Sequence, residues 1–307
     1  MKIIKKIGCI ANGIIRRSHW YNEIIFPDCK KFWTQRTFNL NVINLGSTSG
    51  LYAFNYKGLN IKAANWALRH NPILADQEIL NNYYSYLNPN GAVVIIPLCP
   101  FTSLSGSNDY FEDKFYTLVR MSSIPHPSMR RKMQVWDIMN RPLKYYPVFD
   151  ALYVSKKCLK DFFLDKRRAL SEKEMEADSN VWYDSWLHEF SIQDFSNPLS
   201  LINQDAIKDA ACILNEMIDF CKERNLRPVL IIPPMYHTLA EKFSPKVREI
   251  IISSLINRLK SENLEFLNYL DASDFANDKS LFQNSFLLNE KGARKFTKMI
   301  LEEIKVI

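Results

Sequence analysis

The chain has 307 residues, of which 47% are hydrophobic and 13% aromatic, and it carries a formal net charge of +7 at pH 7. A chain of this size can bury a large core, as one large domain or as two small ones. The low count of eight glycines and the lack of repeats or low-complexity tracts argue against fibrous and glycine-rich classes. The six cysteines show no CxxC spacing, so they are predicted to be reduced core residues rather than a disulfide framework.

Most of the positive charge lies in residues 1–36, which hold eight Lys and Arg against two acids. The rest of the chain is therefore close to neutral, which argues against a nucleic-acid-binding groove. In this basic N-terminal segment isoleucines recur at helical spacing: Ile3, Ile4, Ile7, Ile10, Ile14 and Ile15. The pattern is typical of a helix on a membrane surface, or of a terminal helix that covers the core with its basic side in solvent.

The longest apolar runs fall short of the roughly 18 residues that a membrane-spanning helix needs. Charged and polar residues interrupt the short apolar runs near the N-terminus, so no secretory pattern is present there. The sequence therefore predicts a cytoplasmic protein, with peripheral membrane contact through residues 1–36 as an open alternative.

From residue 40 onward, short apolar runs alternate with amphipathic stretches. The apolar runs are typical of buried strands, and they occur at Leu40–Leu45, Gly58–Ala64, Ala92–Ile96, Pro228–Ile232 and Leu264–Leu270. The stretches with helical spacing run from Pro72 to Leu87 and over Ala206–Arg224, Pro245–Leu259 and Glu290–Ile304. This alternation predicts a three-layer α/β/α fold of the flavodoxin-like kind, with about five parallel strands.

The alternation breaks down between Cys99 and Ser200, a stretch too long for an ordinary connection. Residues 101–200 are predicted to form a largely helical cap, inserted into an α/β domain that spans 37–307. The cap is expected over the carboxyl ends of the first three strands, where open α/β sheets bind ligands. Its many aromatic residues are interpreted as the core of the cap, with a sugar-stacking platform as the alternative.

Two short segments carry a more specific pattern. Residues 288–296 read Leu-Asn-Glu-Lys-Gly-Ala-Arg-Lys-Phe, and residues 41–50 read Asn-Val-Ile-Asn-Leu-Gly-Ser-Thr-Ser-Gly. The first resembles the last signature block of the SGNH (GDSL-like) hydrolases, in which an Asp-x-x-His pair precedes a Leu-Asn-x-x-Gly-Ala helix start. The second is similar to the strand and turn that present the family's serine as Gly-Asp-Ser. The resemblance covers the alternating core and implies an SGNH-like fold with altered catalytic blocks.

In that family a Ser attacks an acyl carbonyl, a His near the C-terminus removes its proton, and an Asp three residues earlier orients the ring. Read in register, Thr48 occupies the nucleophile position, with Ser47 and Ser49 as neighbouring hydroxyls. Leu287 stands at the position of the His and Asn284 at the position of the Asp. The resemblance therefore implies a hydrolase-like frame without its usual base.

The resemblance also implies substrate contacts. Gly46 permits the turn, and Asn65 stands where the family binds the oxyanion, although the glycine of that block is missing. The alternative for Asn65 is a buried asparagine that ties two loops together. Asn284 and Asn289 are the other candidates for substrate binding. A literal Gly-x-Asn-Asp at residues 106–109 lies well beyond the strand that carries this motif in the family, so it is interpreted as accidental.

Because Leu287 cannot accept a proton, another base is needed. Of the five histidines, His237 follows the fourth strand and is the best candidate, with His126 and His188 of the cap as alternatives. A lone loop histidine is also commonly a plain solvent-facing residue. No metal-ligand spacing, Walker loop or dinucleotide motif is present, so neither a metal nor a cofactor is expected.

Two functions remain open on the sequence alone. The first is an esterase or acyltransferase acting on an acylated polar substrate, such as a glycan in surface polysaccharide metabolism, with Thr48 as nucleophile and His237 as base. The second is a catalytically inactive SGNH-like protein that binds a glycan or a protein partner. The fold favours the first function, and the missing base favours the second. No nucleic-acid partner is expected.

Overall fold

The computed structural model describes residues 27–33, 37–106, 115, 118, 169–260 and 264–307. By its contacts the chain divides into two compact units, one of residues 1–36 and 111–168, the other of residues 37–110 and 169–307. In the first unit the described elements are the 3-10 turn Pro27–Cys29 and the short helix α2, Lys30–Trp33. The second unit contains the sheet and all the elements discussed below.

The sheet has five strands, all parallel, in the order β2-β1-β3-β4-β5. They are β1 Val42–Asn44, β2 Ala63–Asn65, β3 Val93–Pro97, β4 Arg227–Ile232 and β5 Glu265–Asn268. Each overlaps one of the predicted strand regions, and the predicted parallel α/β class is confirmed.

The three central strands are built from Val, Ile and Leu in unbroken runs, and they are buried along almost their whole length. Unbroken apolar runs of this kind are what a sheet covered on both faces requires. The edge strands β2 and β5 are only partly buried, and their sequences are more mixed.

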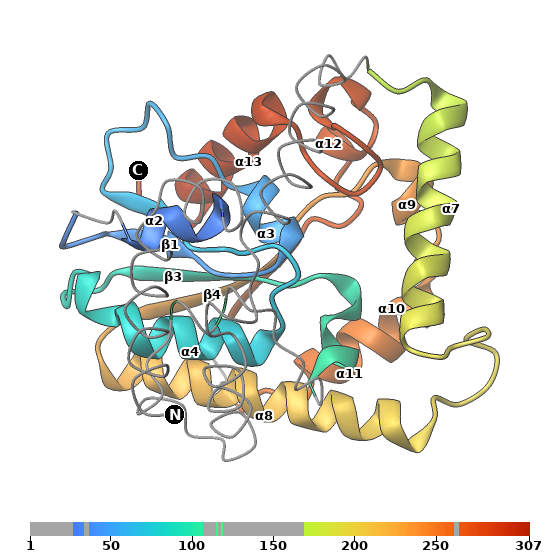
Figure 1. Cartoon of the computed structure of the whole chain (residues 1–307), viewed down its shortest axis with the longest axis horizontal. Coiled ribbons are helices and arrows are strands. Elements are labelled where there is room, and N and C mark those ends of the chain that lie inside the picture. The colour runs from blue at the N-terminus through green and yellow to red at the C-terminus, as the bar shows by residue number, and fades with distance from the viewer. Residues whose placement is uncertain (1–26, 34–36, 107–114, 116–117, 119–168, 261–263) are drawn as a thin grey trace, which may run out of the picture. The chain divides into compact units, whose positions relative to one another are not determined.

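Helices cover both faces of the sheet, with α4 and α8 on one side and α3 and α13 on the other (Figure 1). Helix α4, Ile73–Tyr83, contacts α8, Leu201–Glu223, and the short α3, Thr48–Ala53, contacts α13, Glu290–Glu303. The other helices are α7 Glu172–Glu189, α9 His237–Ala240, α10 Pro245–Arg248, α11 Ser254–Ile256 and α12 Ser273–Ala276. Shorter turns are the 3-10 segments η3 Tyr84–Tyr86, η4 Pro100–Ser105 and η8 Lys279–Leu281, and the π turn Glu249–Ser253.

The strand order creates a switch point between β1 and β3. The chain leaves β1 to build β2 on one side and then crosses over to build β3 on the other. In open α/β sheets, ligands bind outside the carboxyl ends of the strands at such a point. Over the part of the chain that is described, no helix combines the length and the apolar character needed to cross a membrane.

Candidate functional site

The turn that follows β1, Gly46–Ser49, lies at the switch point and is called the hydroxyl turn here. Gly46 has φ +109°, which favours glycine, and a Cβ there would lie 3.3 Å from Pro97 of β3. A Cβ on Gly50, inside α3, would lie 2.7 Å from the Leu45 carbonyl oxygen. The two glycines therefore let the hydroxyl turn lie directly beside the end of β3.

A buried carboxylate fixes the backbone of the hydroxyl turn. Asp76, 4% exposed in the first turn of α4, accepts a hydrogen bond from the Gly46 N–H at 3.0 Å. It accepts a second from the Asn71 side chain at 2.6 Å. The Gly46 carbonyl oxygen accepts from the Leu68 N–H at 3.0 Å. Both backbone groups of Gly46 are used by the fold, so its role in this structure is to shape the turn.

The loop after β2 brings two backbone N–H groups to the hydroxyls. The Asn71 N–H donates to Ser47 Oγ at 3.3 Å, and the His70 N–H donates to Thr48 Oγ1 at 3.4 Å. Ser47 and Thr48 are half-buried, whereas Ser49 is only 6% exposed inside α3. Of the three hydroxyls singled out from the sequence, Ser47 and Thr48 are therefore the more accessible.

Among the described histidines, His70 is the one whose backbone N–H reaches this turn, and the sequence did not single it out. His70 is exposed, and its backbone is left-handed, with φ +52°, which is uncommon outside glycine. A weak signal was available, because His70 and Asn71 directly precede Pro72 at the start of a predicted helix. They therefore had to lie on the carboxyl side of the second strand.

Asn65, predicted to contact substrate, is engaged within the fold. Its side-chain amide lies 3.4, 3.0 and 3.0 Å from the carbonyl oxygens of Gly50, Leu51 and Phe54, at the end of α3. Its Oδ1 accepts from the Asn44 side chain at 3.1 Å. These bonds tie β1 and β2 to α3, so the side chain holds the short helix that carries the hydroxyl turn.

The C-terminal block of the resemblance begins a helix. Asn289 is the N-cap of α13, where its side chain accepts from the Gly292 N–H at 3.0 Å. The same side chain donates to the carbonyl oxygens of Ser280 and Phe282 at 2.8 and 3.2 Å. A Cβ on Gly292 would fall 2.1 Å from the Leu281 carbonyl oxygen. The Leu-Asn-x-x-Gly-Ala pattern therefore specifies how α13 packs on the turn before it.

The two altered positions shape the loop that precedes this helix. Asn284 Oδ1 accepts from the N–H groups of Phe286 and Leu287, at 3.1 and 2.7 Å, as in an Asx turn. Leu287 is 7% exposed, and the Phe286 ring lies 4.9 Å from the ring of Trp182 on α7. The position at which the SGNH resemblance places a base thus holds a buried apolar side chain, Leu287, and Asn284 stabilises the loop backbone.

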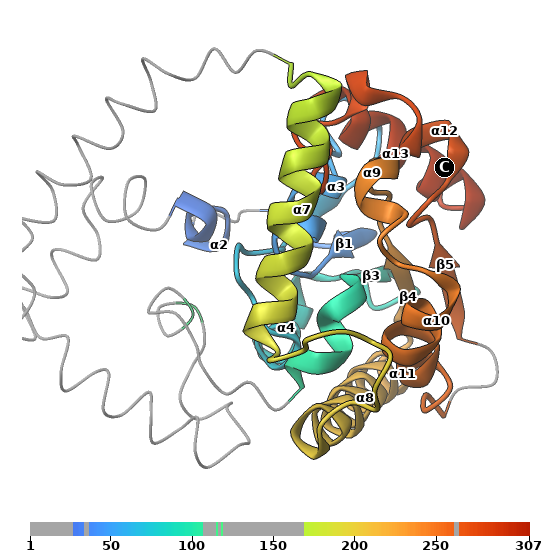
Figure 2. The same cartoon turned by 90° about the vertical axis from the view of Figure 1, so that its right-hand side faces the viewer.

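Helix α7 contacts α9, which follows β4, and the two run side by side in Figure 2. Its aromatic rings also meet Phe101, after β3, and Phe286, after β5. The Asp178 carboxylate accepts from the N–H and hydroxyl of Ser285 at 2.9 and 2.6 Å. Aromatic rings from these segments form one continuous cluster: Phe101, Trp182, Tyr183, Trp186, Phe190, Phe195, Phe243 and Phe286. The aromatic residues of this part of the predicted cap therefore pack as a core.

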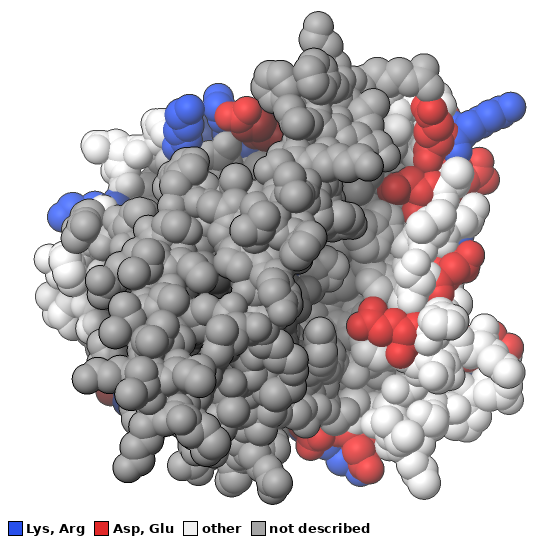
Figure 3. Space-filling model, in the orientation of Figure 1, with Lys and Arg blue, Asp and Glu red and all other residues white. Residues whose placement is uncertain are grey.

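Helix α7 is also strongly acidic, because its 18 residues include six acids and a single lysine. In Figure 3 acidic side chains gather along the edge of the molecule where α7 lies. Acidic side chains along one edge create a negative local potential. Helix α7 therefore carries a net negative charge.

His237 begins α9, just beyond β4, but it belongs to a different polar group. Its ring lies 4.5 Å from the ring of Tyr236, and its Nδ1 lies 3.3 Å from Glu241 Oε1. The Tyr236 hydroxyl donates to Glu172 at 2.7 Å, and Glu172 pairs with Lys279 at 3.0 Å. Burial and the Glu172 carboxylate raise the pKa of Tyr236 to about 12, so its hydroxyl stays a neutral donor. Over the described residues, the contacts of His237 connect it to this group and not to the hydroxyl turn.

Other candidate groups contribute little chemistry. Burial raises the pKa of the Cys99 thiol, just beyond β3, to about 12, so it is no thiolate nucleophile at neutral pH. Where the chain is described, no cluster of three or more metal-ligating side chains occurs. Gly106 packs on α8, where a Cβ would fall 2.2 Å from the Ala206 carbonyl oxygen, and residues 107–109 lie outside the described ranges. His126 also lies outside them, and His188 is in the last turn of α7.

Comparison of the chain with protein-family models, with curated proteins and with solved structures returns no match. The parallel α/β fold is therefore established by the structure, and the finer family resemblance rests on the two sequence blocks. Of the residues singled out from the sequence, the structure brings Gly46 and the three hydroxyls to the switch point. Asn65, Asn284 and Asn289 make hydrogen bonds within the fold.

Proposed function

We propose that the hydroxyl turn is the reactive centre of an esterase or acyltransferase. The observation that carries this proposal is the convergence of Ser47 and Thr48 with the backbone N–H groups of His70 and Asn71. These groups meet at the switch point of the sheet, where open α/β folds bind ligands. A substrate carbonyl oxygen bound here would replace Ser47 Oγ and Thr48 Oγ1 as the acceptor of these N–H groups, which would then stabilise an oxyanion.

In the proposed reaction Thr48 is the nucleophile, Ser47 is the alternative, and His70 replaces Leu287 as the base. The imidazole removes the hydroxyl proton as Thr48 Oγ1 attacks the acyl carbonyl, which gives a tetrahedral intermediate. Its collapse releases the alcohol, which takes the proton from the imidazolium, and leaves the acyl group on Thr48. Water or a second alcohol then attacks this ester by the same route in reverse. Asp76 acts as a positioning residue that holds the turn.

The proposed substrate is an acylated polar molecule without negative charge, such as an O-acetylated glycan in surface polysaccharide metabolism. The acyl group follows from the resemblance to the SGNH hydrolases. The lack of charge follows from the acidic α7, which repels anions from this edge of the sheet.

Hydrolysis of p-nitrophenyl acetate by the purified chain tests this proposal. Thr48→Ala or His70→Gln should lower kcat/KM about 10²- to 10⁴-fold, because each removes a group that acts in the transition state. His237→Gln is the matched control and should leave the rate unchanged. Thermal melting of each variant shows whether the fold is intact.

If His237→Gln loses turnover and His70→Gln does not, the base is His237, the histidine first inferred from the sequence. Turnover that survives Thr48→Ala and Ser47→Ala together would contradict a reactive hydroxyl turn. Neither histidine substitution is expected to disturb the fold, because His70 is exposed and His237 is half-exposed.

A second function, a non-catalytic protein that binds a glycan or protein partner at this edge, is favoured by one observation. Leu287 is buried at the base position, beside the aromatic cluster. If the wild-type chain shows only background hydrolysis, the double substitution Asn284→Asp with Leu287→His should raise it. Wild-type turnover that Thr48→Ala abolishes would rule this function out.

A further inference from the structure

A tyrosine on α3 lies beside the hydroxyl turn. Tyr52 comes four residues after Thr48, so the two residues share one face of the helix. Helical side chains lean toward the N-terminus of their helix, which directs the Tyr52 side chain over the turn that begins with Thr48. Both residues are half-buried. Tyr52 is therefore the next side chain along this face of α3 after the proposed nucleophile.

The loop after β2 contacts both of these residues. The Arg69 guanidinium donates to the Tyr52 hydroxyl at 2.9 Å, and its central carbon lies 5.7 Å from the centre of the Tyr52 ring. The N–H of the next residue, His70, donates to Thr48 Oγ1 at 3.4 Å. Because consecutive residues of one loop reach Tyr52 and Thr48, a group bound at Thr48 has the Tyr52–Arg69 pair next to it.

Backbone hydrogen bonds hold this loop on both sides of Arg69. The Leu68 N–H donates to the Gly46 carbonyl oxygen at 3.0 Å, and the Asn71 N–H donates to Ser47 Oγ at 3.3 Å. Arg69 therefore starts from a fixed backbone, and its planar guanidinium loses little further freedom when it meets Tyr52. A binding group held in this way is pre-organised, which lowers the entropic cost of binding a ligand.

The Tyr52 hydroxyl keeps a donor that the fold does not use. A phenol oxygen accepts a hydrogen bond while its O–H donates another. This oxygen accepts from Arg69, and over the part of the chain that is described it makes no other hydrogen bond. Linked hydrogen bonds polarise one another, so donation by a guanidinium cation makes the Tyr52 O–H a stronger donor. The pair thus offers one strengthened O–H group beside Thr48.

We propose that Tyr52 binds the alcohol half of the substrate ester, by donating a hydrogen bond to a hydroxyl oxygen next to the acylated position. The acyl carbonyl oxygen is bound by the N–H groups of His70 and Asn71 in the proposed reaction, which leaves the Tyr52 donor for the alcohol half. Arg69 is a positioning residue that orients the phenol. The substrate class is then a vicinal diol with one acylated hydroxyl, as in a partly acetylated sugar ring. This inference rests on the proposed reaction at Thr48.

Two esters that differ by a single hydroxyl group test the inference: trans-2-hydroxycyclohexyl acetate and cyclohexyl acetate. The purified full chain should hydrolyse the hydroxy ester with the higher kcat/KM. In Tyr52→Phe the ratio of kcat/KM for the two esters should fall about tenfold, the contribution of one hydrogen bond of ordinary strength. The fall should appear as a higher KM for the hydroxy ester, because the bond is present in the ground state as well as in the transition state.

Substitutions of Arg69 separate positioning from a general structural role. Arg69→Met should lower the same ratio by a smaller factor, because the phenol remains but loses its orientation. Arg69→Lys should restore part of the ratio, since an ammonium group also donates to the hydroxyl. A merely structural role would lower kcat/KM for both esters equally and leave the ratio unchanged. Thermal melting of each variant shows whether the fold is intact.

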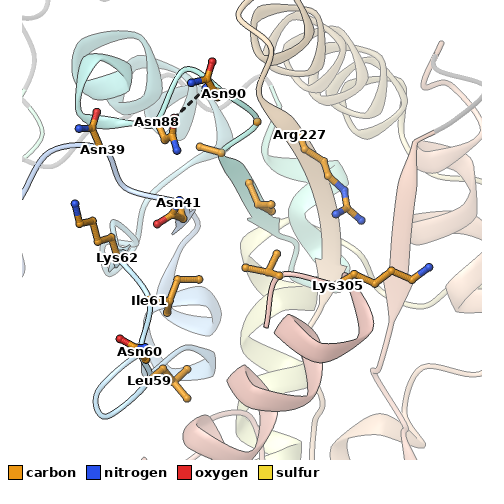
Figure 4. A pocket seen from close by; sticks show the side chains of 14 residues that line it. Asn39, Asn41, Leu59, Asn60, Ile61, Lys62, Asn88, Asn90, Arg227 and Lys305 are labelled. Atoms are coloured by element: carbon orange, nitrogen blue, oxygen red, sulfur yellow. Dashed lines mark hydrogen bonds between the residues drawn. The ribbon is translucent and has the colours of Figure 1, made fainter.

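A polar cavity at the opposite, amino-terminal edge of the sheet supplies the control for net charge (Figure 4). The cavity has a volume of about 820 Å³ and is lined by segments that lead into β1, β2, β3 and β4. Lys62 lies in this lining, just before β2, and it is exposed, whereas Arg69 follows β2. Lys62→Met removes one positive charge, as Arg69→Met does, but at the other end of the strand. It should leave the ratio unchanged.

Three results would overturn the inference, and they differ in what they leave standing. If turnover depends on Thr48 but Tyr52→Phe keeps the wild-type ratio, Tyr52 does not bind the substrate and the reactive centre stands without it. If neither ester is hydrolysed, or if Thr48→Ala leaves turnover unchanged, the reactive centre fails and the inference fails with it. An equal fall of the ratio in Lys62→Met and Arg69→Met would assign the effect of Arg69 to net charge.

Discussion

At the scale of single residues, the buried Asp76 carboxylate determines where the hydroxyl turn lies. Asp76→Ala leaves the Gly46 N–H and the Asn71 amide without their acceptor. We expect the free energy of unfolding, measured by urea denaturation, to fall by about 1–3 kcal/mol, the usual cost of an unsatisfied buried group. Asp205→Ala is the control, because Asp205 is exposed and its ion-pair partner among the described residues is the equally exposed Lys208. Equal stabilities for the two variants would mean that Asp76 does not hold the turn.

Glu78 on α4 gives a second residue-scale prediction, for pH dependence. It is fully buried, and burial, reinforced by the Glu216 carboxylate, raises its pKa from 4.5 to about 7. Between these values the folded chain holds a proton that the unfolded chain releases, so the contribution of Glu78 to stability falls as pH rises from 4.5 to about 7. We therefore expect Glu78→Gln to raise the melting temperature at pH 8 more than at pH 5.

Glu176→Gln, at an exposed position of α7, is the matched control for this measurement, and it should change the melting temperature little. A Glu78→Gln chain that is destabilised equally at both pH values would show that the carboxyl group is charged and paired in the folded protein.

The sequence indicated the hydroxyl turn, because Gly46 ends an apolar run and hydroxyl residues follow it. It indicated His70 only weakly, by its place before Pro72, because the backbone of His70 meets Thr48 across a separation of 22 residues that only the path of the folded loop determines. Nor could it show that the amide of Asn65 is engaged with carbonyl oxygens of α3. Short motifs report residue type and order, while these contacts depend on tertiary structure.

At the scale of secondary-structure elements, the start of α13 shows what the C-terminal block specifies. Gly292→Ala would place a methyl group 2.1 Å from the Leu281 carbonyl oxygen, so α13 must shift away from the preceding turn. We expect a loss of about 1–3 kcal/mol in unfolding free energy, as for other overpacked sites, in urea denaturation. Lys298→Ala, on the exposed side of the same helix, should change it little. A stable Gly292→Ala chain would show that the helix has room to move.

The boundaries of the elements were predictable only in part. Helix α8 begins at Leu201 rather than at the predicted Ala206, because Ser200 caps it by accepting from the Asn203 N–H at 3.2 Å. Its first residues are exposed, so they carry no apolar periodicity. Helix α3 was not delimited from the sequence, since six residues are too few to show a helical period.

At the scale of the whole molecule, the parallel sheet could be predicted because each of the three central strands contains an unbroken run of Val, Ile or Leu. The order of the strands places the ends of β1 and β3 at the switch point, and it leaves the amino ends of four strands around a polar cavity lined by five asparagines, among other residues. That cavity could not be predicted, because its residues come from segments far apart in the chain.

The basic segment of residues 1–36 makes a prediction for the whole chain. Its positive charge and helically spaced isoleucines are typical of membrane-surface helices. If it binds membranes, liposomes with anionic lipid should float the protein at low salt and release it as salt rises, because exposed charges are screened over about 10 Å at 0.1 M. Replacement of Lys2, Lys5, Lys6, Arg16 and Arg17 by Gln should abolish flotation. Equal flotation of the wild-type chain and this variant would contradict electrostatic membrane binding by the segment and favour a structural role.

The central claim, a reactive hydroxyl at the end of β1, is tested most directly by covalent labelling. A fluorophosphonate probe phosphonylates hydroxyls that a neighbouring base activates. After incubation of the full chain, we expect peptide mass spectrometry to find the label on Thr48 or Ser47, with less in His70→Gln and none in heat-denatured protein. A folded chain that carries no label on this peptide, or the same label after denaturation, would contradict the claim.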